Sequence, residues 1–457
     1  MQPINISAYN LIHQGALALS HISQTGMRID TDYCERMMEE VETKIKELTL
    51  DFDGSDLGRQ WKKKYGSSYN MGSDTQLGAM LYDEMKLEPP SYTDKFNPSV
   101  NQTALEALNI PDLKIFLEIR KWNKANSTYF GNILRETNDD GFLRPFFNLN
   151  TVATYRSSSS NVNFQNIPVR DPEVGVMIRR AFLPRPGRQI FEPDYGGIEV
   201  KVAACYNHDP VFIEDILAGD MHRDMAMECF ILTPEEMGTK GDKMFDTIRY
   251  CSKNMFVFPQ FYGSYFVSCA RDLWEAIDQM GLKTAQGVSL KRHLKSKGIR
   301  NQATFEKHLE KVEDEFWNER YSVYTSWKDS NIKNYDRNGY IDTLTGFRCQ
   351  GVMTRNQINN YPIQGSAFHC LLWSLIQINN WLRDSALETK IIGQIHDSIA
   401  FDLVPEEKDE VIEKVLRVTT EDIREHWDWI ILPLEVEADL TPIDAPWSDK
   451  KEIRMAA

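Results

Sequence analysis

The sequence predicts a mostly helical α/β fold, and three observations point to this class. Over residues 33–48, apolar side chains recur at steps of three and four, which indicates an amphipathic helix. Residues 188–194 read as a short strand that ends at Asp194 and then turns into a helix. Residues 390–401 read as two strands joined by a tight turn that carries Asp397. Two acids are therefore expected at strand ends in an otherwise helical protein.

The composition is that of a folded protein with a large core. The chain has 457 residues, of which 42% are apolar and 26% charged, and a chain of this length needs no cross-links. Its seven cysteines include no Cys-x-x-Cys pair, which fits a reducing compartment. The longest mostly apolar stretch, 367–378, is too short to span a bilayer, and the N-terminus does not resemble a signal peptide. We therefore expect a soluble, cytoplasmic protein without a membrane partner.

The charge balance does not decide whether the partner is a nucleic acid. The chain has 52 basic and 67 acidic residues, a net charge of −15, and nucleic-acid-binding domains are usually basic. Local basic runs nevertheless occur at 62–64, 120–121, 179–188 and 291–300. Since a charge run is often only a solvated face, these runs alone assign no function.

The remaining elements are predicted in chain order from periodicity and turn residues. They are a helix over 113–129, an extended or loop segment over 163–168, further helices over 206–340, a hairpin over 339–348 and a buried helix over 365–382.

Asp194 and Asp397 are the first candidates for chemistry. If the fold brings these carboxylates together, their like charges raise one pKa unless cations bridge them. Carboxylate oxygens suit Mg²⁺, and two such ions about 3.5–4 Å apart stabilise the attacking and leaving oxygens of a phosphoryl transfer. Either acid alone would be taken as an ordinary turn residue, so the sequence spacing does not pair them.

A second candidate is the segment between the two acids. Arg249 and Lys253 lie at positions i and i+4 of one helical face, and aromatic residues follow from Phe256 to Tyr262. Such a pair of cations could hold a triphosphate, and the aromatic stripe could stack a base. Taken alone, the same segment also reads as a surface charge pair above a core face.

Six short motifs, in the same order along the chain, resemble those of family A DNA polymerases, the bacterial DNA polymerase I type. They are residues 154–158, residues 163–170, Asp194 to Glu199, the set Arg249, Lys253, Phe258 and Tyr262-Gly263, residues 360–365, and Gln394 to Ser398. Residues 70–77 and 120–129 also resemble the thumb of that family. Each motif is short, but six in order span nearly the whole chain.

The resemblance implies a right-hand polymerase fold with a helical thumb, an antiparallel-sheet palm and helical fingers. We assign residues 1–140 to an N-terminal segment and the thumb, 141–205 to the first part of the palm, 206–340 to the fingers and 341–457 to the second part of the palm. The implied function is template-directed DNA synthesis, in which dNTPs extend a primer 3′-hydroxyl. The implied partners are primer-template DNA and dNTPs, and the implied cofactor is a pair of Mg²⁺ ions.

The resemblance also implies roles for individual residues. Asp194 and Asp397 would be the catalytic residues and would hold the metal ions together with the Tyr195 carbonyl. The expected dNTP-binding residues are His222, Arg249 and Lys253 at the phosphates, Phe258 at the sugar, Tyr262 near the templating base, and Glu199 in the space of a 2′-hydroxyl. The expected DNA-binding residues are Arg156, Asn163, Gln165, Arg170, Arg355, Asn360, Gln364 and His396.

Two positions depart from the family pattern. Ser398 stands where the family usually has Glu, which is not an essential ligand there, so we expect activity without the supporting role of that Glu next to Asp397. Lys253 and Tyr262 are one residue further apart than usual, and Pro259 lies between them. An inserted residue in a helix is often absorbed as a π-bulge, so we predict a bulge or kink between Lys253 and Phe258. A straight helix would instead make Val257 the neighbour of the sugar.

The family often carries a 3′→5′ exonuclease domain ahead of the thumb, whereas the thumb-like helices here begin within the first ~35 residues. We therefore expect a polymerase domain without its own proofreading, similar to phage-type members and acting in the cytoplasm of an infected bacterium. A monomer is expected, and a separate exonuclease or processivity subunit would be a compatible partner.

Two alternatives remain open from the sequence. A single-subunit RNA polymerase shares the two-metal palm and commonly has His-Asp-Ser in its final motif, as at Ser398, but Glu199 argues against ribonucleotides. A non-catalytic nucleic-acid-binding relic is the second alternative. It is disfavoured because both acids and both cations, Arg249 and Lys253, are retained.

Overall fold

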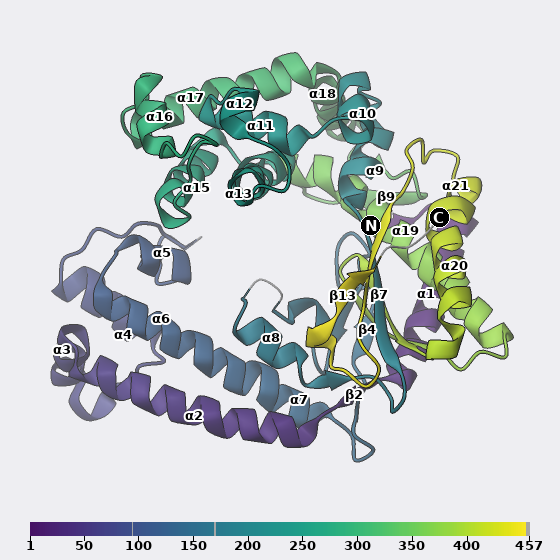
Figure 1. Cartoon of the computed structure of the whole chain (residues 1–457), viewed down its shortest axis with the longest axis horizontal. Helices are drawn as coiled ribbons and strands as arrows, with labels where there is room; N and C mark the ends of the chain where they lie inside the picture. The colour runs from purple at the N-terminus through teal and green to yellow at the C-terminus, as the bar shows by residue number, and fades with distance from the viewer. Residues whose placement is uncertain (94, 169–170, 454–457) are drawn as a thin grey trace.

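The computed structural model describes residues 1–93, 95–168 and 171–453. Figure 1 shows three groups of elements around a central opening. The long helices α2 (Thr31–Gly54) and α6 (Pro111–Asn123) run along the bottom, and a cluster of helices lies above them. The main sheet closes the opening on the right, and further helices lie behind it.

The main sheet is antiparallel, and its strand order is β10-β11-β7-β12-β13. The strands are β7 (Gln189–Tyr195), β10 (Lys390–Ile395), β11 (Ser398–Leu403), β12 (Val436–Leu440) and β13 (Lys451–Ile453). Successive side chains of β7 point to opposite faces. The Tyr195 hydroxyl lies 2.8 Å from Ser374 Oγ on a helix behind the sheet, so Asp194 points to the other face, toward the opening. The predicted strand and hairpin are both confirmed.

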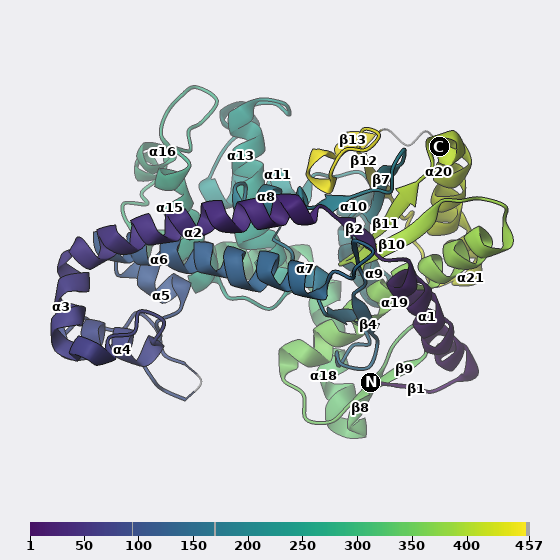
Figure 2. The same cartoon turned by 90° about the horizontal axis from the view of Figure 1, so that it is seen from below.

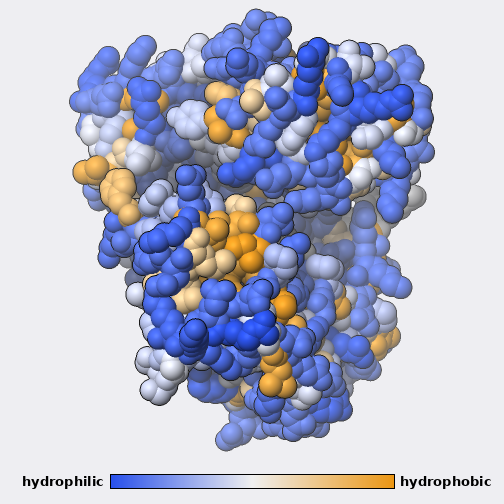
Figure 3. Space-filling view, turned by 90° about the vertical axis from the view of Figure 1, so that its left-hand side faces the viewer, coloured by the Kyte–Doolittle hydropathy of each residue, from blue (hydrophilic) through white to orange (hydrophobic). Residues whose placement is uncertain are grey.

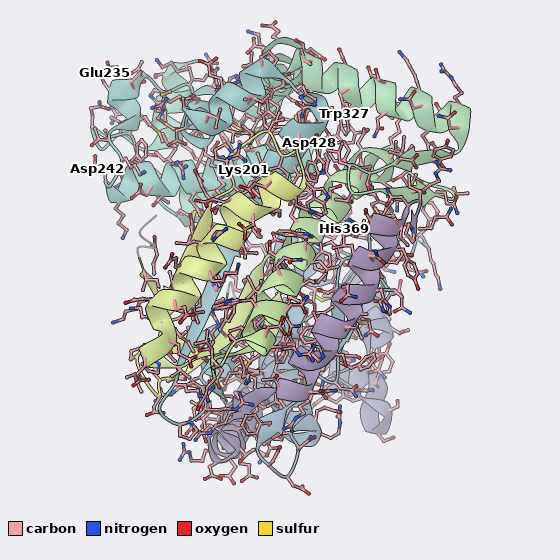
Figure 4. All side chains as sticks on the ribbon, turned by 90° about the vertical axis from the view of Figure 1, so that its right-hand side faces the viewer. Lys201, Glu235, Asp242, Trp327, His369 and Asp428 are labelled. Carbon is pink, nitrogen blue, oxygen red and sulfur yellow. The ribbon has the colours of Figure 1, made fainter. Side chains whose placement is uncertain are left out.

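The back of the sheet is covered by α19 (Arg355–Asp384), which lies between α1 (Ile6–Thr25) and α20 (Lys408–Arg417) in Figure 4. The helix predicted over 365–382 is therefore confirmed, but it begins ten residues earlier. Thr354 caps it: its hydroxyl accepts from the Gln357 N–H, while the Gln357 side chain accepts from the Thr354 N–H. This capping box explains the early start.

Short strands and helices link the main sheet to the rest of the chain. The small sheets are β1-β9-β8, β3-β2-β6 and β4-β5. Their strands are β1 (Gln2–Pro3), β2 (Met27–Ile29), β3 (Phe142–Leu143), β4 (Phe146–Asn148), β5 (Ser158–Ser160), β6 (Phe182–Leu183), β8 (Tyr340–Asp342) and β9 (Phe347–Gln350). The nearby helices are α8 (Val174–Arg179), α9 (Ile198–Asn207) and α21 (Ile423–His426). The pairing of β8 with β9 confirms the hairpin predicted over 339–348.

The lower helices form an arm with its own small core. Figure 2 shows α2 and α6 side by side along the arm. The shorter helices are α3 (Asp56–Tyr65), α4 (Asp74–Gly78), α5 (Gln102–Ala107) and α7 (Gly131–Glu136). At the far end, Phe52, Trp61 and Phe116 are buried in a cluster separate from the main core. The apolar stripe predicted from residue 33 faces inward, since Tyr33 and Val41 are buried.

The upper helices continue from α9 and form the other wall of the opening. They are α10 (Pro210–Leu217), α11 (Met221–Phe230), α12 (Pro234–Met237), α13 (Lys243–Ser252), α14 (Phe258–Phe261), α15 (Phe266–Gln279), α16 (Leu290–Ser296), α17 (Gln302–Asp314) and α18 (Ser322–Asn338). In the space-filling view of Figure 3, a hollow separates these upper helices from the arm below. None of the described helices is long and apolar enough to cross a membrane.

Candidate active site

The sheet brings Asp194 and Asp397 together, although they are about 200 residues apart in sequence. Asp194 is the second-last residue of β7 and lies directly opposite Ser398, the first residue of β11. Asp397 precedes Ser398 in the turn between β10 and β11, and its carbonyl accepts a hydrogen bond from the Tyr195 N–H at 3.2 Å. We call these two carboxylates the acid pair. Strand register therefore fixes their separation.

The acid pair holds more negative charge than its surroundings balance. Burial by the surrounding protein, followed by the charges of Asp397 and Glu192, raises the pKa of Asp194 to about 7. Burial also raises the pKa of Asp397 to about 6, although Arg156 acts in the opposite direction. A cation bound between the carboxylates would relieve this penalty.

The donor set at the acid pair fits Mg²⁺ better than a metal that needs a complete protein cage. Within the described ranges, no three His, Cys, Asp or Glu side chains are grouped as metal ligands. Mg²⁺ is commonly held by one or two carboxylates together with water and substrate phosphates. Asp194 and Asp397 would offer such an incomplete set of oxygen donors, and the contribution of the Tyr195 carbonyl stays a prediction.

Hydrogen bonds from neighbouring side chains hold the turn that carries Asp397. His396 has a φ of 50°, an uncommon left-handed conformation for a residue other than glycine. Its N–H donates to Gln165 Oε1 at 2.6 Å, and the Gln165 amide in turn donates to the Gln394 carbonyl at 3.1 Å. Ser157 Oγ also donates to the Gln394 side chain. Both ends of the Gln165 amide are thus used inside the protein.

The opposite wall carries α13, a π-helical turn over Lys253–Val257 and α14, which together we call the fingers helix. The π-helical turn confirms the bulge predicted between Lys253 and Phe258. It absorbs the extra residue, so Val257 is buried while Phe258 lines a small cavity with Glu199 and Tyr262. Phe258 and Tyr262, at the aromatic end of the fingers helix, therefore share this cavity with Glu199.

The two cations of the fingers helix, Arg249 and Lys253, both lie near His222. Lys253 Nζ is 5.2 Å from the centre of the Phe258 ring, and the His222 ring meets that of Phe258 edge-on at 5.7 Å. Arg249 Nε lies 2.9 Å from both carboxylate oxygens of Asp220. Burial, helped by Arg249 and Lys253, lowers the pKa of His222 to about 4, so its ring is neutral at pH 7.

Glu199 connects the two walls of the site. Arg156 Nη1 donates to its Oε1 at 3.1 Å, and the Tyr262 hydroxyl donates to its Oε2 at 2.7 Å. Burial, together with the negative charge of Glu199, raises the pKa of Tyr262, so the phenol remains a donor. Both carboxylate oxygens are fixed, one from the sheet side and one from the fingers helix.

The predicted DNA-binding residues do not all lie in one place. Arg156, Gln165, Gln364 and His396 line one cavity of about 350 Å³. Asn360 lines the cavity beside Glu199. Asn163 Oδ1 caps a short turn by accepting from the Gln165 N–H at 3.0 Å, and Arg355 is exposed at the start of α19. Arg170 lies outside the described residues.

Three residues at the site were not predicted from the sequence: Glu192, Asp220 and Lys450. Glu192 is buried next to Asp194 and accepts hydrogen bonds from Ser398 and Lys450. Asp220 pairs with Arg249. The alternation of side chains along β7 could have placed Glu192 on the same face as Asp194, whereas no local signal links Lys450 to it.

Three comparisons place the chain among known proteins. The family model for DNA polymerase family A matches residues 31–443. The DNA polymerase of Bacillus phage SP01 is 28% identical over 402 residues, which is 82% of this chain and 40% of that protein. DNA polymerase I of Bacillus subtilis (strain 168) is 28% identical over 450 residues, which is 95% of this chain and 45% of that protein. The chain thus spans less than half the length of these curated relatives.

A solved structure with a similar fold is the POL domain of Pol1 from M. smegmatis, in complex with DNA primer-template and dNTP. The TM-score is 0.73 at 23% sequence identity, and the match covers 95% of this chain and 70% of that chain. This likeness confirms the predicted fold class. The right-hand fold with a helical thumb, an antiparallel-sheet palm and helical fingers is thereby shown, while the residue bounds assigned to each part stay a prediction.

Proposed function

Because the chain belongs to DNA polymerase family A, we propose that it is a template-directed DNA polymerase that extends a primer 3′-hydroxyl with dNTPs. One observation carries this proposal: Glu199 joins the two walls of the site, because Arg156 near the acid turn and Tyr262 of the fingers helix each donate to one of its carboxylate oxygens. A dNTP offers a triphosphate to the cations, and a primer terminus offers a hydroxyl to the acid pair. The proposal concerns only the 457 residues of this chain.

The acid pair would hold two Mg²⁺ ions, with the Tyr195 carbonyl as a further oxygen donor. Bound there, the ions would lower the pKa of the attacking hydroxyl and neutralise charge on the leaving pyrophosphate. The support is electrostatic, because the pKa values of Asp194 and Asp397 are raised to about 7 and about 6 in their absence. The chain's own contribution is the fixed strand register that holds the carboxylates side by side.

The cations of the fingers helix would bind the triphosphate. Arg249 is now paired with Asp220 and would exchange this carboxylate for a phosphate, since both acceptors suit a guanidinium. Lys253 has no carboxylate within 4 Å in the part of the chain that the structure describes, so it is free to bind phosphate. His222 is neutral and would donate a hydrogen bond without adding charge.

Selection of the sugar would depend on Glu199 and Phe258. Because Arg156 and Tyr262 hold both oxygens of Glu199, its carboxylate resists displacement by a 2′-hydroxyl. Phe258 lines the same cavity and would pack against the sugar. A ribonucleotide would have to break at least one of these charged hydrogen bonds, which are worth about 1.5–3 kcal/mol each.

The DNA contacts would lie around the cavity next to the acid turn. Arg156, Gln364 and His396 line it, and Asn360 lies close by. We propose that these side chains contact the minor groove near the primer terminus, where the acceptors are similar for every correct base pair. Gln165 and Asn163 would act indirectly, because Gln165 bonds to the turn that carries Asp397 and Asn163 bonds to Gln165. Arg355, which is exposed at the start of α19, would contact the phosphate backbone of the DNA.

The test is primer extension on one primed template with Mg²⁺, using dNTPs and rNTPs in parallel. We expect extension with dNTPs, and we expect Asp397→Asn to reduce the rate at least about 1,000-fold through loss of metal binding. Asp428→Asn, which removes an exposed carboxylate in the loop after α21, serves as the matched control. Glu199→Ala should raise the use of rNTPs relative to dNTPs.

Other outcomes would favour the alternatives. Preferential use of rNTPs by the unaltered chain would indicate an RNA polymerase. DNA binding without extension under all conditions would indicate a non-catalytic relic. Extension that persists in Asp397→Asn would contradict the role assigned to the acid pair.

A further inference from the structure

A buried carboxylate that the proposed mechanism does not use lies beside the acid pair. Glu192 precedes Asp194 by two residues in β7, so both point to the same face of the sheet. Glu192 is only 7% exposed. Its Oε1 accepts from Ser398 Oγ at 2.8 Å, and its Oε2 accepts from Trp447 Nε1 at 2.7 Å and Lys450 Nζ at 2.6 Å. A buried charge is tolerated when it is paired and hydrogen-bonded, as here.

Ser398 connects this carboxylate to the acid pair. It follows Asp397 in sequence and lies opposite Asp194 across the β11–β7 pairing. Its hydroxyl is also 2.9 Å from the Ile395 carbonyl, at the other end of the turn. A hydroxyl donates only one proton, and a charged carboxylate is the stronger acceptor. Glu192 therefore holds the Ser398 side chain at the base of the turn that presents Asp397.

The C-terminal segment holds Glu192 from the other side. Trp447 is 2% exposed and packs edge-on against Phe182 at 5.6 Å. Lys450 also lies 2.9 Å from Asp439 Oδ2, and Asp439 is the residue opposite Glu192 in β12. Lys450 thus pairs with two neighbouring carboxylates at once, so Glu192 has little freedom to move.

We propose that Glu192 is a positioning residue for the acid pair. Held by Trp447 and Lys450, it fixes the Ser398 hydroxyl, and Ser398 fixes the turn that sets Asp397 beside Asp194. Loss of the hydrogen bond between Ser398 and Glu192 would let the two carboxylates of the acid pair move relative to each other. The acid pair would then bind a divalent cation more weakly. The inference deepens the proposed function and rests on it for the reaction, while its cation-binding part can be measured separately.

The test compares Ser398→Ala, Glu192→Gln and the double variant with the unaltered full chain. Ser448→Ala, at a partly exposed serine of the same C-terminal segment, is the matched control. The first readout is the Mg²⁺ concentration that gives half of the Mg²⁺-induced rise in Tm, measured without DNA or dNTP. The second is kcat and the KM for dNTP in primer extension.

Both single variants should raise the Mg²⁺ midpoint about tenfold, as expected for residues that orient metal ligands. The kcat should fall by a similar factor, while the KM for dNTP stays within about twofold because the cations of the fingers helix are untouched. The double variant should be no worse than the more damaging single variant, since both changes break one link. Ser398→Thr keeps the hydroxyl and should restore the midpoint.

A lowered Tm with an unchanged Mg²⁺ midpoint in Ser398→Ala would reduce Glu192 to a packing role and overturn the inference. Additive effects in the double variant would overturn the link through Ser398. If Glu192→Gln does not fold, the comparison of Ser398→Ala with Ser398→Thr still decides. A chain that fails to extend primers would contradict the proposed function, while the Mg²⁺ titration would still test the positioning role.

Discussion

The two walls of the site are built in different ways. The acid pair lies on a sheet whose strand register, turn and buried neighbours leave its carboxylates little freedom. The cations lie on the fingers helix, where Arg249 is held by one partly exposed carboxylate, Asp220. The difference follows from the chemistry that each wall would perform. Ligands of a metal pair must keep a fixed geometry, whereas a phosphate clamp must release its resting partner when substrate binds.

The largest expected effect tests how the fingers helix keeps its two ends in register. Deletion of Tyr250, an exposed residue of α13 between the two cations, should rotate Arg249 by about 100° relative to Lys253 and Phe258. Arg249 would then no longer lie on the same face as Lys253, and each charged hydrogen bond that a bidentate guanidinium makes to phosphate is worth about 1.5–3 kcal/mol. We therefore expect kcat/KM for dNTP to fall at least about 100-fold in steady-state primer extension.

Deletion of Asn254 is the matched control, because it removes one residue from the π-helical turn. The only hydrogen bond of its side chain within the described chain is to the Tyr250 carbonyl. Removing a residue from a π-bulge restores an ordinary α-helix and keeps both flanks in phase, so kcat/KM should change by less than about tenfold. Equal losses from both deletions would show that the π-helical turn does not keep Phe258 and Lys253 in register.

This same helix shows what the sequence could predict. The bulge was predicted from a comparison with the family pattern, which has one residue fewer between Lys253 and Tyr262, and from the proline at 259. The strands and the turn at the acid pair followed from alternation and turn residues. Such features are local, so nearby residues determine them. The right-hand fold was implied by the resemblance of six motifs, in the same order, to those of family A DNA polymerases.

The partners of the site residues could not be predicted in this way. Lys450 reaches Glu192 from more than 250 residues away, and Asp220 reaches Arg249 from a separate helix. These contacts depend on tertiary packing, which leaves no periodic signal in the sequence. Gln165 shows the same limit, because its amide bonds to the acid turn. The resemblance gave Gln165 as a DNA-binding residue, which stays a prediction, and its contacts within the protein come from the fold.

The prediction of intermediate size concerns the core behind the main sheet, where a buried histidine should make the stability of the fold depend on pH. His369 of α19 is fully buried, its Nδ1 lies 2.7 Å from Thr345 Oγ1, and burial lowers its pKa to about 3. Below pH 6.5 the unfolded chain takes up a proton at this histidine and the folded chain does not, so stability falls as the pH drops from 6.5 toward 3. At pH 5 the loss is about 2 kcal/mol relative to pH 7.5.

The variant His369→Asn keeps a polar atom near Nδ1 but cannot be protonated. The decline in its free energy of unfolding between pH 7.5 and pH 5 should be smaller by about 2 kcal/mol, as measured by urea denaturation at each pH. Thr345→Val changes the same contact without removing the histidine, so it should lower stability at pH 7.5 but retain the full pH dependence. An unchanged pH dependence in His369→Asn would contradict the assignment.

The smallest expected effect concerns the exchange of partners at Arg249. Burial alone would raise the pKa of Asp220, but hydrogen bonds from Arg249 and from the Arg223 N–H lower it, so Asp220 is charged at pH 7. This charge competes with the triphosphate for Arg249. Asp220→Asn removes the competition and keeps the cap of α11, because Asn also accepts from the Arg223 N–H.

A partly exposed ion pair of this kind is worth about 0.5–1 kcal/mol, so the KM for dNTP should fall about two- to fivefold in Asp220→Asn. Asp224→Asn is the control, because Asp224 lies on the same helix but pairs with Arg223 and Arg320. It should leave the KM unchanged. A higher KM in Asp220→Asn would mean that Asp220 aims Arg249 at the phosphate. The cation wall would then be as firmly positioned as the acid pair, because a fixed carboxylate would orient each functional group.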